Sequence, residues 1–163
     1  MAVFGIEVER DQTGPRLIQL SFFLQNRVGA LLSIVRVLEE KNIHLCALSV
    51  LDAADHAVVR MVVDRPDMAA EALRESGHEV FATELLGVEV PAETREAGPR
   101  KILAALLLAE LNVHYVYSLI VRTNNHAVLA LHVDDVETAI RVLRNHGLNL
   151  IGQDELIWDD EKA

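Results

Sequence analysis

The sequence repeats itself at a spacing of 70 residues. Aligned with itself at this offset, the chain needs no gap from residue 42 to residue 86, and 11 of the 42 positions in 42–83 are identical. Chance would give about three identities at ordinary composition. The matched segments include Asn42-Ile43-His44 on Asn112-Val113-His114, and His56-Ala57-Val58 on His126-Ala127-Val128. A fixed internal period is the mark of a duplicated unit, so the chain is predicted to fold as two copies of one unit of about 70 residues.

Each copy combines the two-residue period of strands with the period of an amphipathic helix. In 17–24, apolar residues alternate along the chain, whereas in 30–41 Leu31, Ile34, Val35 and Leu38 recur at helical spacing. Strands are predicted at 17–24, 43–51, 57–63, 80–86, 87–90, 113–121, 126–133 and 148–158, and helices at 30–41, from Pro66 to before Gly77, at 101–111 and from Val136 to Leu143.

The predicted order in each copy is β-α-β-β-α-β, the ferredoxin-like arrangement in which two helices cover one face of a four-stranded antiparallel sheet. The predicted class is therefore α+β, with two βαββαβ units whose sheets lie side by side. Unit 1 is expected to span 1–84, including an N-terminal extension of 1–16, and unit 2 to span 85–163. Pairing of the edge strands 43–51 and 113–121 would join the units into one eight-stranded sheet, because a bare edge strand invites aggregation.

Composition excludes several classes of protein. Half of the residues, 51%, are hydrophobic, and the formal charge of −10 repels a phosphate backbone, so we expect no nucleic-acid partner. The longest apolar run, 102–109, is far shorter than the roughly 20 residues that span a bilayer. No secretory signal is recognisable, and the single cysteine, Cys46, cannot form an intrachain disulfide. A cytoplasmic protein without a membrane segment is expected.

The sequence contains no recognisable catalytic constellation. Its serines lack the nucleophile-elbow motif, and a glycine-rich phosphate loop is missing. The seven histidines are not spaced as ligands on one strand or one helix turn. We therefore expect neither a metal nor a cofactor, and we expect a protein that is not an enzyme. An enzyme built on a ferredoxin-like scaffold stays an alternative that a cleft with converging His and Asp side chains would favour.

Two segments carry a family resemblance. Residues 24–32, LQNRVGALL, followed by 38–43, LEEKNI, resemble the ACT domain, a module that senses small molecules in phosphoglycerate dehydrogenase and in acetolactate synthase regulatory subunits. The family pattern is a strand, an N-R-P-G-x-L turn into a helix, and an N-I at the next strand. Gly29 suits this turn because it lets the backbone N–H groups of a helix start approach a carboxylate. The resemblance implies a ferredoxin-like fold and a small amino acid as ligand.

The resemblance also implies which residues bind. One complete pocket is expected between the units, and a second, pseudo-equivalent pocket is expected to be altered or empty, because Glu96 and Pro99 align with Asn26 and Gly29. Val28 replaces the proline of the pattern, and the apolar Leu24 favours an aliphatic ligand over serine. The complete pocket would contain Asn26, Arg27, Val28, Gly29, Ala30, Leu31, Asn112 and Val113, and the altered one Asn42, Ile43, Gly98 and Pro99.

The resemblance thus implies a non-catalytic regulatory protein that signals to a separate enzyme of amino-acid metabolism. The alternative is a regulatory or assembly subunit without a ligand, as for acetolactate synthase. The residues add one expectation of their own. Because the segment 102–109 is apolar on every side, its helix must bury more than the face on the sheet, which predicts a homodimer.

Overall fold

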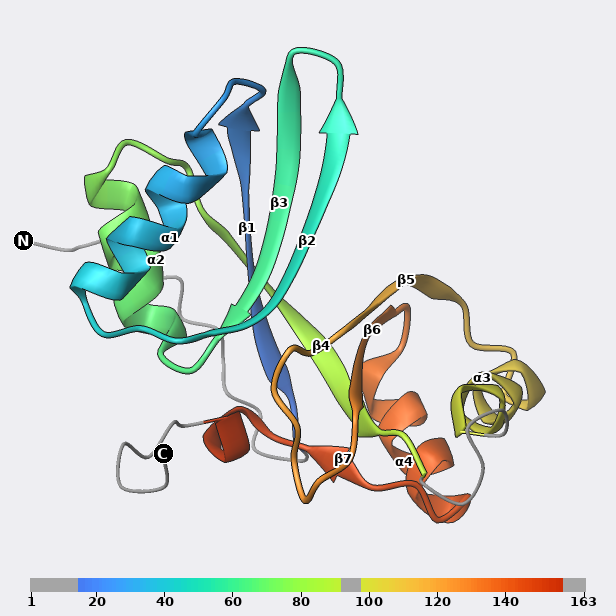
Figure 1. Cartoon of the computed structure of the whole chain (residues 1–163). Coiled ribbons are helices and arrows are strands. Elements are labelled where there is room, and N and C mark those ends of the chain that lie inside the picture. The colour runs from blue at the N-terminus through green and yellow to red at the C-terminus, as the bar shows by residue number, and fades with distance from the viewer. Residues whose placement is uncertain (1–14, 92–97, 157–163) are drawn as a thin grey trace, which may run out of the picture.

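A computed structural model of the chain describes residues 15–91 and 98–156. These residues form seven strands and four α-helices, and Figure 1 shows how they are arranged. The elements are β1 (Leu17–Gln25), α1 (Ala30–Glu40), β2 (Leu45–Ala53), β3 (His56–Val63), α2 (Pro66–Glu75), β4 (Phe81–Glu89), α3 (Gly98–Leu108), β5 (Val113–Ser118), β6 (Val128–Val133), α4 (Val136–Asn145), β7 (Leu150–Ile151) and a 3-10 helix (Gln153–Leu156). None of these helices is long and apolar enough to cross a membrane.

Strand β4 belongs to both repeats. Its first half, Phe81–Leu85, pairs with β1, and its second half, Leu86–Glu89, pairs with β6. Unit 1 therefore has the strand order β2-β3-β1-β4, and unit 2 has the order β5-β6-β4-β7, all antiparallel. The predicted α+β class with two βαββαβ units is confirmed. The proposed division between residues 84 and 85 falls inside β4, where the pairing passes from one unit to the other.

Three details of the prediction are wrong. The sheet has seven strands with β2 and β5 at opposite ends of the order, so these edges do not join the units into an eight-stranded sheet. The strands expected at 80–86 and 87–90 are one continuous strand. The strand expected at 148–158 is only Leu150–Ile151, because the chain then turns into a 3-10 helix. The predicted extension 1–16 lies largely outside the described residues.

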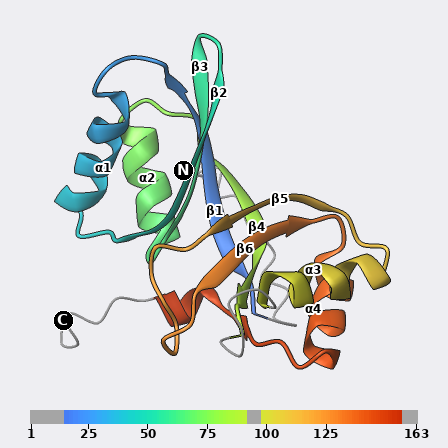
Figure 2. The ribbon, with the colours of Figure 1, turned by 45° about the vertical axis from the view of Figure 1, so that its right-hand side comes forward.

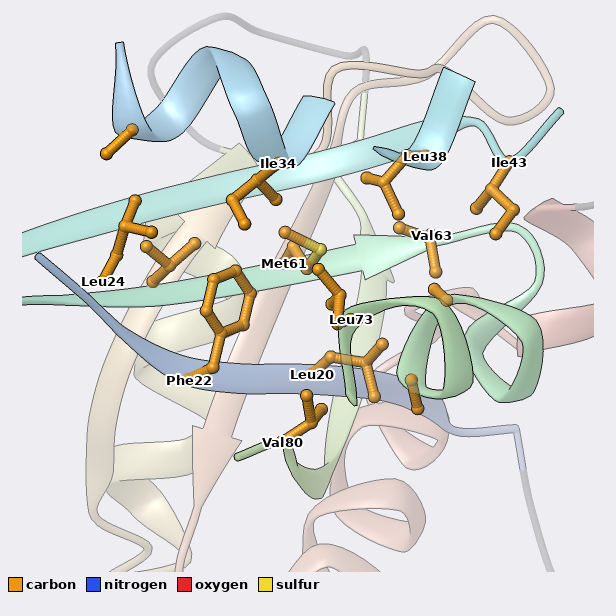
Figure 3. Close-up of a cluster of buried hydrophobic side chains, with 14 residues drawn as sticks. Leu20, Phe22, Leu24, Ile34, Leu38, Ile43, Met61, Val63, Leu73 and Val80 are labelled. Carbon is orange, nitrogen blue, oxygen red and sulfur yellow. The ribbon is translucent and has the colours of Figure 1, made fainter. Parts of the chain in front are cut away.

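Each unit has its own aliphatic core between its helices and its sheet. In unit 1, Leu20 and Phe22 from β1 meet Ile34 and Leu38 from α1, as Figure 3 shows, and all four are at most 2% exposed. In unit 2, Ile102 of α3 and Leu143 of α4 pack with Leu86 of β4 in the same way. The two cores explain the helical spacing seen in the sequence.

The helix-free faces of the two sheets pack against each other. Leu17 of β1, Val62 of β3 and Ala130 of β6 are fully buried in this inter-unit interface. The alternation in β1 therefore has apolar residues on both sides, because one face is covered by helices and the other by the second unit. A backbone hydrogen bond from Ile120 N–H to the Cys46 carbonyl, at 2.7 Å, links the segment after β5 directly to β2.

A buried glutamine at the inter-unit interface holds two tyrosines of unit 2. Gln19 is 1% exposed; its amide donates to the Tyr115 hydroxyl at 2.8 Å, and its carbonyl accepts from the Tyr117 hydroxyl at 2.7 Å. The Arg60 guanidinium lies 4.0 Å from the centre of the Tyr115 ring. Burial, with the neighbouring Tyr115, raises the pKa of Tyr117, so its hydroxyl stays a donor.

A second buried polar group, Glu89, fastens the end of β4 to two loops. Its carboxylate accepts from the Thr123 hydroxyl at 2.6 Å and from the amides of Asn124 at 3.0 Å and Asn149 at 2.7 Å. Burial opposes ionisation of Glu89, but these three donors outweigh it, so its pKa lies below the ordinary value.

We expect Gln19→Leu to lower the free energy of unfolding by about 2–4 kcal/mol, because two tyrosine hydroxyls at the inter-unit interface lose their partner. Urea denaturation measures this change. Gln25→Leu is the matched control on the exposed end of the same strand and should change stability by less than about 0.5 kcal/mol. Equal effects of the two substitutions would contradict a stabilising role for the Gln19 contacts.

Glu89→Gln should cost about 1–3 kcal/mol at neutral pH, because a neutral amide accepts these hydrogen bonds less well and turns a donor toward Asn149. Since the folded-state pKa of Glu89 is lowered, its stabilisation is present above the ordinary pKa and is lost as pH falls through the folded-state value. The difference in the free energy of unfolding between Glu89→Gln and the original protein should therefore shrink on acidification. Urea titrations from pH 7 to pH 3 measure this difference. A gap independent of pH would show that the charge contributes nothing.

Candidate functional site

The loop between β1 and α1 (Asn26–Gly29, the β1–α1 loop) is fully on the surface. All four residues are exposed, and Val28 is as exposed as in an extended chain. Gly29 has φ 82, a left-handed conformation that favours glycine, and it stands at the N-cap position of α1. The loop is closed by a hydrogen bond from the Ala30 N–H to the Arg27 carbonyl at 3.2 Å. Gly29 thus delivers the chain into α1 through a tight turn.

The start of α1 carries positive polarity that no side chain caps. No side chain caps this helix end, and its first turn contains no acidic residue. The first N–H groups of a helix lack partners within the helix and carry the positive end of its dipole. By contrast, Asp135 caps α4 by accepting from the Thr138 N–H at 3.0 Å. An anion is therefore favoured at the start of α1, beside the exposed Arg27.

The tip of the β2–β3 hairpin forms the other side of the β1–α1 loop. The Asn26 amide donates to the Asp52 carboxylate at 3.1 Å, and the Asn26 N–H donates to the Asp55 carbonyl at 3.3 Å. Asp52 and Asp55 are exposed. Positive polarity at the start of α1 thus lies near negative charge at the hairpin tip, with Asn26 between them. A zwitterion has the complementary pair of charges.

Asp52 and Asp55 were missed from the sequence. The signal that could have found them is strand register: in the structure Gln25 pairs with His56, and His56 pairs with Ala53. Because Asn26 directly follows Gln25, this register places Asn26 at the tip of the β2–β3 hairpin.

The structure does not bring Asn112 and Val113 to the β1–α1 loop of the same chain. Asn112 precedes β5, where its N–H donates to Asp134 at 3.2 Å and its amide lies 3.4 Å from the His114 ring. Val113 packs at the edge of the unit 2 core. Figures 1 and 2 both show α1 and β5 in different parts of the molecule. The reason is the joining of the units through β4 instead of through β2 and β5.

The residues expected to form the altered pocket are also separate. Asn42 has φ 54 and donates its N–H to the Glu39 carbonyl, so it ends α1, and Ile43 is buried in the unit 1 core. Gly98 is buried at the start of α3, where an added Cβ would lie 2.4 Å from the Val90 side chain. Pro99 next to it is exposed.

The remaining expected residues divide between loop and core. Ala30 is 6% exposed and Leu31 is half-buried, so both anchor the start of α1. Leu24, expected to favour an aliphatic ligand, is 7% exposed within the unit 1 core and does not line the loop surface.

Three of the histidines have other neighbours, and the cysteine is a buried free thiol. His44 binds the buried Asp64 through its ring at 3.0 Å, and the His114 ring lies 5.0 Å from the His132 ring. In the described ranges, no three His, Cys, Asp or Glu side chains gather as metal ligands could. Burial, with the charge of Asp64, raises the pKa of Cys46 to about 12, so its thiol stays protonated.

Comparison with known proteins decides the family. Residues 16–158 match a family model described as an ACT domain pair. The chain belongs to this family. ACT domains are regulatory modules, and the resemblance seen in residues 24–43 is confirmed. No curated protein sequence matches the chain.

Solved structures share the ACT pair fold. A crystal structure of a Bacteroides thetaiotaomicron protein is 30% identical, has a TM-score of 0.78, and its match covers 87% of this chain and 96% of that one. The ligand-free regulatory subunit of aspartate kinase from Thermus thermophilus is 16% identical at a TM-score of 0.59, covering 80% and 92%. The corresponding subunit from Thermus flavus is 14% identical at 0.50, covering 82% and 97%. At these identities the two subunits show the fold alone.

Gly29→Ala should lower the free energy of unfolding by about 1 kcal/mol, because a non-glycine residue is strained at this φ while no atom lies within 4 Å of the added Cβ. Gly147→Ala, also left-handed with open space around it, is the matched control in unit 2 and should cost the same. Thermal unfolding compares the two. A loss of stability several times larger for Gly29→Ala than for Gly147→Ala would contradict the view that only the left-handed backbone angle disfavours alanine at position 29.

Proposed function

We propose that this ACT pair is a non-catalytic regulatory protein that binds a small amino acid at the β1–α1 loop of unit 1 and signals to a separate enzyme of amino-acid metabolism. The observation that carries the proposal is the pairing of opposite polarities on either side of Asn26. Membership of a family of regulatory modules supports it, since that family supplies a regulatory role but not a ligand.

The charges of the ligand fit the two sides of the loop. Its carboxylate would accept from the backbone N–H groups at the start of α1, with Arg27 adding positive charge. Its ammonium would donate to the Asp52 carboxylate and to the Asn26 side-chain oxygen. The exposed Val28 and Leu32, 105% and 53% accessible, offer an apolar surface to an aliphatic side chain.

The hairpin tip is the part of unit 1 best placed to carry a signal. Strand β2 is buried at its start, where unit 2 covers it, and exposed over its last four residues at the tip. Because Asn26 bonds to Asp52 and to the Asp55 carbonyl, a ligand that competes for Asn26 changes the tip directly. A ligand shifts binding of the regulated enzyme only by its different affinity for the free and the assembled states.

The setting is part of the same proposal. A reducing cytoplasm suits a chain whose single cysteine, Cys46, is a buried free thiol. A homodimer suits the apolar residues that α3 exposes.

The second candidate function is an assembly subunit without a ligand. Its support is the exposed apolar surface at the hairpin tip, where Leu51 is 55% accessible.

Calorimetry with each common amino acid tests the ligand. Once calorimetry has identified the amino acid, Asn26→Ala and Asp52→Asn should each weaken its binding by at least about tenfold. Each substitution removes a hydrogen bond to a charged group. Asn42→Ala, an exposed asparagine at the other end of α1, is the matched control and should bind normally.

The same titrations separate the alternatives. Absence of heat with every amino acid, together with co-purification of an intact biosynthetic enzyme, would favour the assembly subunit. Loss of binding in Asn112→Ala as well would mean that a second copy supplies Asn112 to the loop. If Asn42→Ala lost binding of the amino acid while Asn26→Ala retained it, the proposed site would be overturned.

A further inference from the structure

Helix α3 exposes leucines along one face. Leu103, Leu107 and Leu108 are 44%, 75% and 78% accessible, whereas Ile102, Ala105 and Leu106 on the other face are buried. Leu103 and Leu107 are one turn apart and so lie on the same side of the helix. Figures 1 and 2 show α3 on the side of the molecule away from α1 and α2. No helix or strand that the structure describes in unit 1 is therefore placed to cover these leucines.

The edge strand β5 adds one exposed apolar residue on the same side of the sheet. Val116 of β5 pairs with Leu131, a residue of the unit 2 core, so its side chain is on the sheet face that carries α3. Val116 is 45% accessible. The α3 face (Leu103, Ala104, Leu107 and Leu108, with Val116 on the same side of the sheet) is exposed apolar surface of the kind that marks protein interfaces.

Charges of opposite sign stand at the two ends of the α3 face. Arg100 and Lys101 are exposed in its first turn. Glu110 is exposed just beyond its last turn, where its N–H donates to the Leu107 carbonyl at 2.9 Å. The face is therefore basic at one end, apolar in the middle and acidic at the other end.

This charge order makes the α3 face complementary to itself. If two copies meet across a two-fold axis with their α3 helices antiparallel, Arg100 and Lys101 of each lie by Glu110 of the other. Leu103 of each then meets Leu107 and Leu108 of the other. The small Ala104 lies near the crossing and lets the helices approach closely. The two helix dipoles are also antiparallel, which is favourable.

Building on the homodimer of the proposed function, we propose that α3 is its contact, packed antiparallel against α3 of a second copy. A two-fold contact needs one patch that fits itself, which the α3 face provides. An anionic membrane is a poorer occupant, because the chain carries a formal charge of −10.

Sedimentation equilibrium on the full chain tests the apolar part. The original protein should sediment at twice 18.1 kDa at micromolar concentration. Leu107→Asp should weaken the dimer at least about 100-fold, because it places a charge in the centre of the contact. Met68→Asp, at an exposed apolar residue of α2 (45% accessible), is the control in unit 1 and should leave the dimer intact. Circular dichroism checks that each variant is folded.

Charge reversal tests the antiparallel orientation. The double variant Arg100→Glu with Lys101→Glu, and separately Glu110→Lys, should each weaken self-association about tenfold, because like charges then meet at both ends. An equimolar mixture of these two variants should recover a dimer at low salt, since every end again meets its opposite.

Several results would overturn the proposal. One is a chain mass of 18.1 kDa for the original protein at every concentration up to about 100 µM. Another is a dimer unaffected by Leu107→Asp. A third is a mixture of the two charge variants that self-associates no more tightly than either variant alone. This result would exclude the antiparallel contact between the helix ends.

Discussion

The whole architecture depends on one strand being shared. Strand β4 ends the sheet of unit 1 and begins the sheet of unit 2, and its partner changes between Leu85 and Leu86. Gly87 follows this change, and an added Cβ there would lie 2.6 Å from Ile151 and 2.8 Å from Leu17. The glycine allows β7 and the start of β1 to converge on the same stretch of β4. With no linker between the units, their relative orientation is set by the twist of one continuous strand.

The fold of each unit was predictable because its helices and strands are specified by patterns of residues close together in the sequence. Helical spacing in 30–41 gave α1, observed as Ala30–Glu40, and Gly77 was expected at the end of α2, where it has φ 89. The duplication doubled the information, since the same pattern appears twice. The joining of the units was not predictable in this way. Any edge strand can pair with any other in principle, and nothing local to residues 80–90 shows that two strands are one.

The candidate site divides along the same line. The β1–α1 loop was identified from Asn26 and Gly29, whose turn chemistry is local and whose resemblance to the family is specific. Asp52 is 26 residues away and reaches Asn26 only through the register of three strands. Asn112 was assigned to the loop on the assumption that the units join through β2 and β5, and the correction of that topology separates it from the loop. Long-range pairing is where sequence reasoning was weakest.

The two copies have diverged in what they leave exposed. In unit 1 the loop after β1 is open, and α1 presents the charged residues Arg36, Glu39 and Glu40 to solvent. In unit 2 the corresponding helix begins at a buried Gly98 packed on Val90, and it exposes leucines instead. Since the buried Gln19 contacts and β4 hold the units together, neither copy can change its position without disturbing the other. Under the two proposals made above, the duplicated fold would assign recognition to the copy whose helix exposes charges and association to the copy whose helix exposes leucines, while the packed interface keeps the two in register.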